Sequence, residues 1–228
     1  MKTKYTFSSK AIEFYSNLYL SKKLPAGIEP MNPYKALGIR NYVESFFQKY
    51  FSDNNNRVFV FGINPGRFGA GLTGITFTDP VALAEFCGIK NNLPQKRELS
   101  SEFIYKLVDM FGGPKKFYRD FYLTTVCPLG FTRNGRNYNY YDNPILLNCV
   151  EPFIANSTNK QLAFGVHRES AIVLGIKNYS IFSDLNKKHG FFKNIYALEH
   201  PRYIMQYRRR RLQEYLKKYY ECFSKALS

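Results

Sequence analysis

The sequence lacks several features that define common classes of protein. It contains no tryptophan, and its four cysteines, Cys87, Cys127, Cys149 and Cys222, lie too far apart to form a CxxC metal or redox motif. It has no run of about 18 apolar residues, which excludes a transmembrane helix, and the amino-terminal MKTKYTFSSK has no apolar signal core. We therefore expect free thiols, a reducing cytoplasmic location, no cofactor, no metal and no membrane-spanning segment.

Acidic residues are also scarce. The chain has 17 Asp and Glu against 33 Lys and Arg, which gives a formal net charge of +16. Such an excess attracts polyanions and speeds their encounter with the protein. Nucleic acid or an anionic membrane surface is the natural partner, and a generic solvated basic surface is the alternative.

The length of 228 residues fits a single domain spanning residues 1–228, and the apolar fraction of 45% is typical of a globular protein. Aromatic residues make up 18% of the chain. Most of these side chains will pack in the core, and some can provide a stacking surface for bases.

Apolar runs and breaker residues predict an alternation of strands and helices. Strands are expected at 57–63, 120–126, 161–166 and 194–198. Loops are expected at 24–33 and 131–142. Helices are expected at 11–20, 35–51, 79–87, 100–110, from 143 onward, at 168–174 and from 201 to about 223, with Asp79-Pro80 and Asn143-Pro144 as capped starts. This order indicates an α/β fold, a three-layer αβα sandwich around a four-stranded, mainly parallel sheet.

In such sheets ligands bind beyond the carboxyl ends of the strands. The residues that follow the predicted strands are Asn64, the stretch 125–128, His167 and His200. Their side chains are therefore the first candidates for chemistry.

The loop after the first strand is rich in glycine, with five glycines from Gly62 to Gly74. Glycine allows the backbone to approach a ligand closely and to present its N–H groups. The loop has neither the GK[ST] of a phosphate-binding loop nor the GxGxxG of a dinucleotide-binding loop. Asn64 can hold a water but is a poor base, and the alternative is a tight turn capped by this asparagine.

His200 lies where the fourth predicted strand passes into a loop. A lone histidine is more often structural, but His200 is expected at the same sheet edge as Asn64. Arg202 and the run Arg208–Arg211 follow it at a predicted helix start, where backbone N–H groups favour phosphate. We favour DNA contact for this run over the alternative of a solvated helix face.

Short motifs occur in a fixed order from about residue 57 to residue 205. They are Gly62-Ile63-Asn64-Pro65-Gly66, Phe68-Gly69, Thr73-Gly74, Phe77, Cys127-Pro128-Leu129, Asn134-Gly135-Arg136-Asn137 and His200-Pro201. Together they resemble the uracil-DNA glycosylase superfamily, and within it the single-strand-selective monofunctional family, as a divergent bacterial branch. The mismatch-specific family has Asn-Pro where this chain has His200-Pro201, and the iron–sulfur families need four grouped cysteines.

The resemblance implies a monofunctional DNA glycosylase of base excision repair, which flips uracil out of DNA and hydrolyses its N-glycosidic bond without a metal. It implies that Asn64 positions the attacking water and that His200 donates to the uracil O2 edge. Phe77 would stack on the base, and Thr125 with backbone groups near Phe68 would read its edge. Gly62, Ile63, Pro65 and Gly66 would line the substrate site.

The DNA backbone would be held by Arg208, Arg209, Arg210 and Arg211, while Arg202 or Tyr203 would fill the gap left by the flipped base. The family has an asparagine where this chain has Thr125, and a different wedge sequence after His200-Pro201. A glycosylase for hypoxanthine or xanthine and a non-catalytic DNA-binding module therefore remain alternatives. A monomer at the bacterial nucleoid is the expected state.

Overall fold

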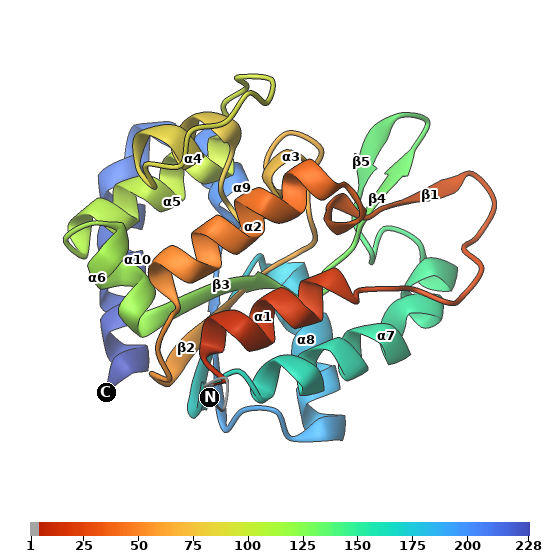
Figure 1. Ribbon diagram of the computed structural model, residues 1–228. Coiled ribbons are helices and arrows are strands. Elements are labelled where there is room, and N and C mark those ends of the chain that lie inside the picture. Colours follow the sequence, from red (N-terminus) through yellow and green to blue (C-terminus); the bar gives the residue numbers. More distant parts are fainter. Residues whose placement is uncertain (1–4) are drawn as a thin grey trace.

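A four-stranded sheet forms the centre of the protein in the computed structural model, which describes residues 5–228 (Figure 1). Its strand order is β3-β2-β6-β7, and every neighbouring pair is parallel. The strands are β2 (Arg57–Gly62), β3 (Phe121–Thr125), β6 (Val166–Leu174) and β7 (Asn194–Leu198). The predicted fold class is confirmed. The predicted domain 1–228 includes residues 1–4, which lie outside the described residues.

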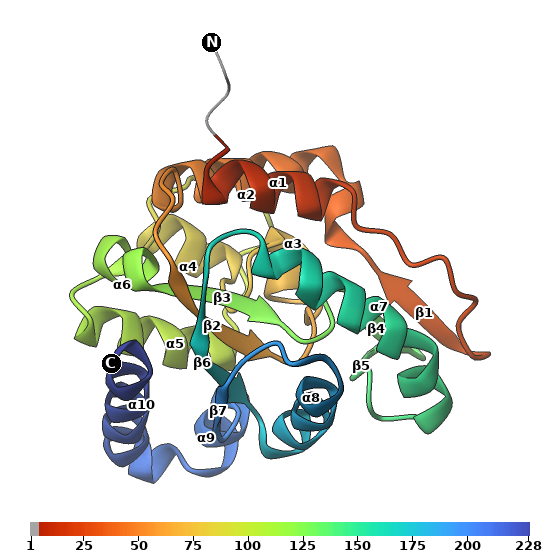
Figure 2. The ribbon, with the colours of Figure 1, turned by 90° about the horizontal axis from the view of Figure 1, so that it is seen from below.

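Helices cover both faces of this sheet (Figures 1 and 2). Phe59 and Tyr122 point to one face, where Tyr122 packs against Phe7, and Phe121 points to the other, where it packs against Phe223. The helices are α1 (Phe7–Ser16), α2 (Leu37–Tyr50), α3 (Ala70–Thr73), α4 (Pro80–Glu85), α5 (Leu99–Met110), α6 (Pro114–Asp120), α7 (Pro144–Leu162), α8 (Ile176–His189), α9 (Pro201–Tyr207) and α10 (Leu212–Leu227), with short 3-10 turns η1 (Pro33–Lys35) and η2 (Arg209–Arg211).

The predicted proline-led helix starts are confirmed. Asp79 caps α4 by accepting a hydrogen bond from the Ala82 N–H, at 2.8 Å. Asn143 caps α7 in the same way through the N–H groups of Ile145 and Leu146. A short polar side chain followed by proline therefore fixes where these two helices begin.

The prediction for residues 161–174 was wrong. Gln161 and Leu162 end helix α7, and the strand predicted at 161–166 begins only at Val166. The segment 168–174, predicted as a helix, is the body of strand β6. Short apolar runs do not distinguish a buried helix end from a buried strand. As a result His167 lies near the amino end of β6, away from the carboxyl edge where it was expected.

A second, three-stranded antiparallel sheet stands beside the first, to the right in Figures 1 and 2. It contains β1 (Ile28–Met31), β4 (Gly130–Arg133) and β5 (Arg136–Tyr138), so the predicted loops at 24–33 and 131–142 each contain strand. The β4–β5 turn uses Asn134 at φ 49° and Gly135 at φ 68°. Two positive φ angles identify a type I′ hairpin, for which Asn-Gly is the preferred pair.

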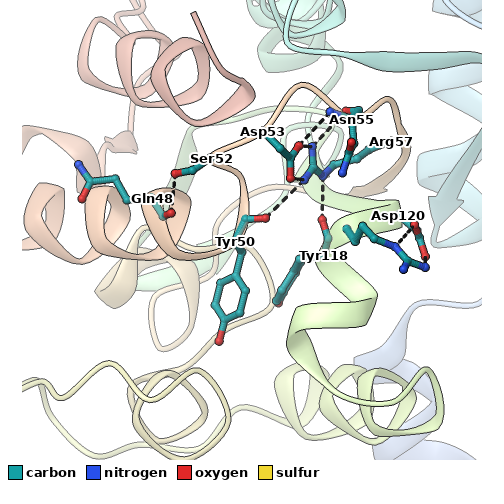
Figure 3. Close-up of polar contacts among 9 residues, drawn as sticks. Gln48, Tyr50, Ser52, Asp53, Asn55, Arg57, Tyr118 and Asp120 are labelled. Carbon is teal, nitrogen blue, oxygen red and sulfur yellow. Dashed lines mark hydrogen bonds and ion pairs between the residues drawn. The ribbon is translucent and has the colours of Figure 1, made fainter. Parts of the chain in front are cut away.

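The amino end of β2 is held by a buried ion pair (Figure 3). The Arg57 side chain is 0% exposed and forms two hydrogen bonds of 2.9 Å with Asp53. It also donates to the Tyr118 carbonyl at 2.7 Å and lies between the rings of Phe7 and Phe51. Since these contacts belong to α1, α6 and the α2–β2 loop, one side chain joins three parts of the fold.

No helix among the described residues is long and apolar enough to cross a membrane. All four cysteines are free thiols. The predicted long final helix is instead divided, because α9 ends at Tyr207 and α10 begins at Leu212.

Candidate active site

A pocket of about 520 Å³ opens at the carboxyl end of the four-stranded sheet. It brings together β2, the glycine-rich loop, β3 and the start of α9. Among the predicted site residues, those that line it are Asn64, His200, Ile63, Pro65, Gly66, Phe77, Thr125, Arg202 and Tyr203. Gly62 and Phe68 lie just outside its lining. A second cavity of about 380 Å³ between α1 and α7 contains none of the predicted residues.

The Asn64 amide is held by the end of the β4–β5 hairpin. Its Oδ1 accepts a hydrogen bond from the Tyr140 N–H at 3.2 Å, and its Nδ2 donates to the Tyr138 carbonyl at 3.4 Å. Opposite backbone groups therefore fix which way the amide faces. Tyr140 is itself anchored, because its hydroxyl donates to the buried Asn178 at 2.8 Å.

Phe77 has a left-handed backbone conformation, with φ at 56°. A bulky residue rarely adopts this conformation, which costs on the order of 1–3 kcal/mol. The Thr73 hydroxyl supports the strained turn by donating to the Thr78 carbonyl at 2.6 Å. The turn directs the ring into the pocket, 5.8 Å from the His200 ring between centroids.

The Thr125 side chain is nearly buried at the end of β3. Its hydroxyl donates to the Cys127 carbonyl at 2.9 Å. Because the single hydroxyl proton is used in this bond, the oxygen faces the pocket as a hydrogen-bond acceptor.

His200 is the N-cap of α9. Its Nδ1 accepts the Arg202 N–H at 3.2 Å, so the ring proton of the neutral imidazole is on Nε2. Burial, followed by the positive charge of Arg202, lowers the pKa of His200 from 6.5 to about 4. The imidazole is therefore neutral at physiological pH and presents an N–H donor.

Aromatic and basic side chains surround the pocket mouth. Phe68 is 39% exposed, and the cationic groups of Arg67 and Lys96 lie 4.9 Å and 4.8 Å from its ring centre. On the α9 side, Tyr203 and Tyr207 pack together with ring centres 5.5 Å apart. Exposed rings beside cations are the side chains that single-stranded nucleic acid stacks on.

The four arginines of the run 208–211 are not equivalent. Arg209 pairs with Glu102 at 3.3 Å, and Arg211 pairs with Glu214 at 2.8 Å. Arg208 lies over the Tyr203 ring, at 5.4 Å from its centre. In the described part of the chain, Arg208 and Arg210 have no acidic partner, so their charges are the more available ones.

Comparison with known proteins identifies the family of this chain. The sequence profile of the uracil DNA glycosylase superfamily matches residues 48–224. The chain belongs to this superfamily. It is also similar to the crystal structure of wild-type SMUG2 of Pedobacter heparinus, with 44% identity over 96% of this chain and 97% of that one and a TM-score of 0.93. A search of the curated proteins gave no match.

These matches confirm the predicted family, the fold and the enzyme class, a DNA glycosylase that hydrolyses N-glycosyl bonds. They favour a uracil glycosylase over the two alternatives, a glycosylase for hypoxanthine or xanthine and a non-catalytic DNA-binding module. The roles of individual residues rest on the geometry of the pocket.

Sequence reasoning missed one charged residue that lines the same pocket, Glu98. It comes from the loop before α5, and its Oε2 lies only 1.8 Å from the position that a Cβ on Gly69 would take. Burial raises the pKa of Glu98, while the charge of Arg202 opposes this effect. No apolar pattern or motif marks Glu98, but a Cβ on Gly69 would collide with its carboxylate, and one on Gly66 would lie 3.1 Å from its Oε1.

A substitution at Gly62 tests the predicted stacking role of Phe77. A Cβ at this position would lie 2.7 Å from the Phe77 Cζ, which is closer than real contacts allow. We expect Gly62→Ala to displace the ring and to lower the rate of base removal by about 10-fold or more, because misplaced binding groups reduce catalysis steeply. Single-turnover cleavage of a uracil strand measures this loss, and Gly38→Ala is the control because nothing lies within 4 Å of its Cβ position. Equal rates for Gly62→Ala and the wild type would contradict the assignment of Phe77.

Proposed function

We propose that this protein is a monofunctional uracil-DNA glycosylase of base excision repair. The observation that carries the proposal is the convergence of Asn64, Phe77, Thr125 and His200 on one pocket, from four separate parts of the chain. The target base must leave the stack to enter this pocket. The product is DNA with an abasic site and an unbroken strand.

His200 supplies the electrostatic part of catalysis in this proposal. Breaking the glycosidic bond leaves positive charge on the sugar and negative charge on the departing base. The Nε2–H of the neutral imidazole donates to a base oxygen on which that negative charge develops. One such directed donor contributes about 10²–10³ in rate.

Asn64 positions the nucleophile in this proposal. An amide does not take up a proton, so Asn64 places the attacking water next to the sugar and does not act as a base. Its contacts with Tyr138 and Tyr140 hold the amide in one orientation before substrate binds. A strong nucleophile is not required, because the sugar already carries positive charge when the water attacks.

Thr125 recognises the base through its hydroxyl oxygen, which acts as a hydrogen-bond acceptor. With its proton on the Cys127 carbonyl, the hydroxyl oxygen accepts a hydrogen bond from the ring N–H of uracil. The corresponding ring nitrogen of cytosine carries no hydrogen, so the contact discriminates against the normal base. Hypoxanthine presents the same ring N–H beside a carbonyl oxygen, so this contact does not separate the two deaminated bases.

We expect Thr125→Asn to raise the preference for uracil over cytosine by about 10-fold, since an amide contacts both the ring N–H and the adjacent carbonyl oxygen, and a two-point contact adds about 1–3 kcal/mol of discrimination. The measurement compares single-turnover rates on two strands that differ only in the target base. A ratio identical to that of the wild type would show that Thr125 does not read the base. Thr132→Asn on the β4–β5 hairpin is the control, because Thr132 is not part of the pocket lining.

The remaining parts of the proposal concern the state of the protein. We propose that it acts as a monomer on DNA, without metal or other cofactor, in the cytoplasm at the nucleoid. Among residues 5–228 no three His, Cys, Asp or Glu side chains are grouped as metal ligands. Arg202 or Tyr203, at the pocket mouth, fills the space left by the flipped base.

A panel of end-labelled strands tests the function. Each strand carries one uracil, hypoxanthine, xanthine or thymine at the same place, and is incubated with protein before hot alkali. We expect the uracil strand to break faster than the other three strands, and only after the alkali treatment. Breakage before alkali, or faster breakage of another strand, would contradict it.

A further inference from the structure

The β4–β5 hairpin carries positive charge that the proposed function does not use. Arg133 and Arg136 flank its Asn-Gly turn and are both exposed. The sequence from 130 to 138 has no acidic residue. Figures 1 and 2 show this hairpin standing out from the main sheet, apart from α9.

These two arginines keep their charge available. In the structure from residue 5 onward, neither forms an ion pair, in contrast to Arg209 and Arg211 of the arginine run. The guanidinium of Arg133 donates its one hydrogen bond to a neutral group, from Nη1 to the Tyr138 hydroxyl at 3.5 Å. An exposed guanidinium without an acidic partner is suited to phosphate, which it binds through two parallel N–H groups.

The base of the same hairpin is part of the pocket. Asn137 and Asn139 line it, and the Asn137 Oδ1 accepts the Arg67 N–H at 3.0 Å. The α9 residues Arg202 and Tyr207 line it as well. The pocket therefore lies between two basic elements, the hairpin and α9 with the arginines that follow it.

A strand whose flipped nucleotide occupies the pocket must leave it in two directions. One flank passes over α9 and the arginine run. We propose that the hairpin 130–138 is a second DNA contact, in which Arg133 and Arg136 bind phosphates of the opposite flank. This inference rests on the proposed function, because it assumes that the pocket holds a nucleotide of DNA.

The first test is the salt dependence of binding to a uracil-containing single strand, measured in an Asn64→Ala background. We expect Arg133→Ala with Arg136→Ala to reduce the slope of log K against log salt by about 1.4, since each phosphate contact on a single strand contributes about 0.7. The matched control is Lys115→Ala with Lys116→Ala, which removes the same charge from the exposed side of α6, next to the amino end of β3. An equal change in slope for both pairs would overturn the proposal, because it would reflect net charge alone.

The second test asks which flank the hairpin holds. Two strands are used, each cut short on one side of the uracil. On the strand that lacks the flank held by the hairpin, we expect the hairpin variant to bind as tightly as the parent protein, while Arg208→Ala with Arg210→Ala still weakens binding. On the other strand we expect the hairpin variant to weaken binding, while Arg208→Ala with Arg210→Ala has no effect. Loss of both effects on the same strand would overturn the assignment to opposite flanks.

The failure of this inference is distinguishable from failure of the proposed function. A wild-type protein that removes no base from any strand contradicts the function, whatever the slopes are. A wild-type protein that removes uracil, with unchanged slopes in the hairpin variant, contradicts only the hairpin contact.

Discussion

Replacing His200 by alanine should lower the single-turnover rate of uracil removal by about 10²–10³-fold, the value of one donor directed at developing negative charge. The imidazole lines the pocket and carries its proton on Nε2 because Nδ1 accepts the Arg202 N–H. The matched control is His167→Ala, since His167 is exposed near the amino end of β6. A His200→Ala rate within a few fold of the control would contradict the donor role.

The pH dependence of the single-turnover rate is a second test of the role of His200. Since the pKa of His200 is lowered from 6.5 to about 4, its neutral form is present throughout the physiological range, and no change in rate from this group is expected near pH 6.5. Between these two values the unfolded chain binds a proton that the folded chain does not. This histidine therefore reduces stability progressively as pH falls from 6.5 toward about 4. A rate that changes near pH 6.5 and loses that change in His200→Ala would show a charged imidazole in catalysis.

The second large effect concerns stability. Asp53→Asn should reduce the free energy of unfolding by about 3 kcal/mol, because it leaves the guanidinium of Arg57 buried without its counter-charge. This loss is at the lower end for buried ion pairs because the Asp53 side chain is 38% exposed, so water can partly solvate the Arg57 guanidinium in the variant. Denaturant unfolding followed by circular dichroism measures the change.

The control for this prediction is an exposed ion pair. Asp184 pairs with Lys187 at 2.9 Å, with side chains 65% and 76% exposed, so Asp184→Asn should change stability by less than about 1 kcal/mol. Similar losses for both variants would show that burial of Arg57 has no special weight. Burial favours the neutral form of Asp53, but hydrogen bonds from Arg57 hold its pKa below 3.8. The stability that this carboxylate contributes is thus present above pH 3.8 and is lost as pH falls through the lower folded value.

The residues that meet at the pocket were predictable because they occupy fixed places in a parallel sheet. Asn64 and Thr125 lie at the carboxyl ends of neighbouring strands, and a parallel register brings those ends together. His200 follows the end of β7 at the same edge. The apolar runs that marked β2 and β3 are fully buried strands, for which hydrophobicity is a direct signal, whereas β7 is only partly buried.

The features that were missed depend on contacts between distant segments. The β4–β5 hairpin has few apolar residues, and its strand β4 pairs with β1, about 100 residues earlier in the chain, while β5 pairs only with β4. The Asn134-Gly135 pair was the local signal that would have identified the turn. Glu98 has no such signal, because its position in the pocket follows from the packing of α4 and α5 through the Asp79 carboxylate, which accepts the Glu98 N–H at 2.8 Å.

The arginine run shows the limit of reasoning from charge. The sequence places four cations together, but only the folded chain brings Glu102 of α5 next to Arg209. Pairing with Glu214 within the chain's own final helix also reduces the availability of Arg211. Of the four arginines, Arg208 and Arg210 are therefore the two without an acidic partner among the described residues.

We propose that the pocket around Asn64 hydrolyses the glycosidic bond of uracil in DNA. A single-turnover assay of wild-type protein and Asn64→Ala, purified in parallel, on an end-labelled strand with one uracil tests this proposal most directly. We expect alkali-sensitive cleavage by the wild type and a rate at least about 100-fold lower for Asn64→Ala, as for the loss of a positioned nucleophile. Equal cleavage by both proteins, or no cleavage by the wild type despite salt-sensitive binding, would contradict it.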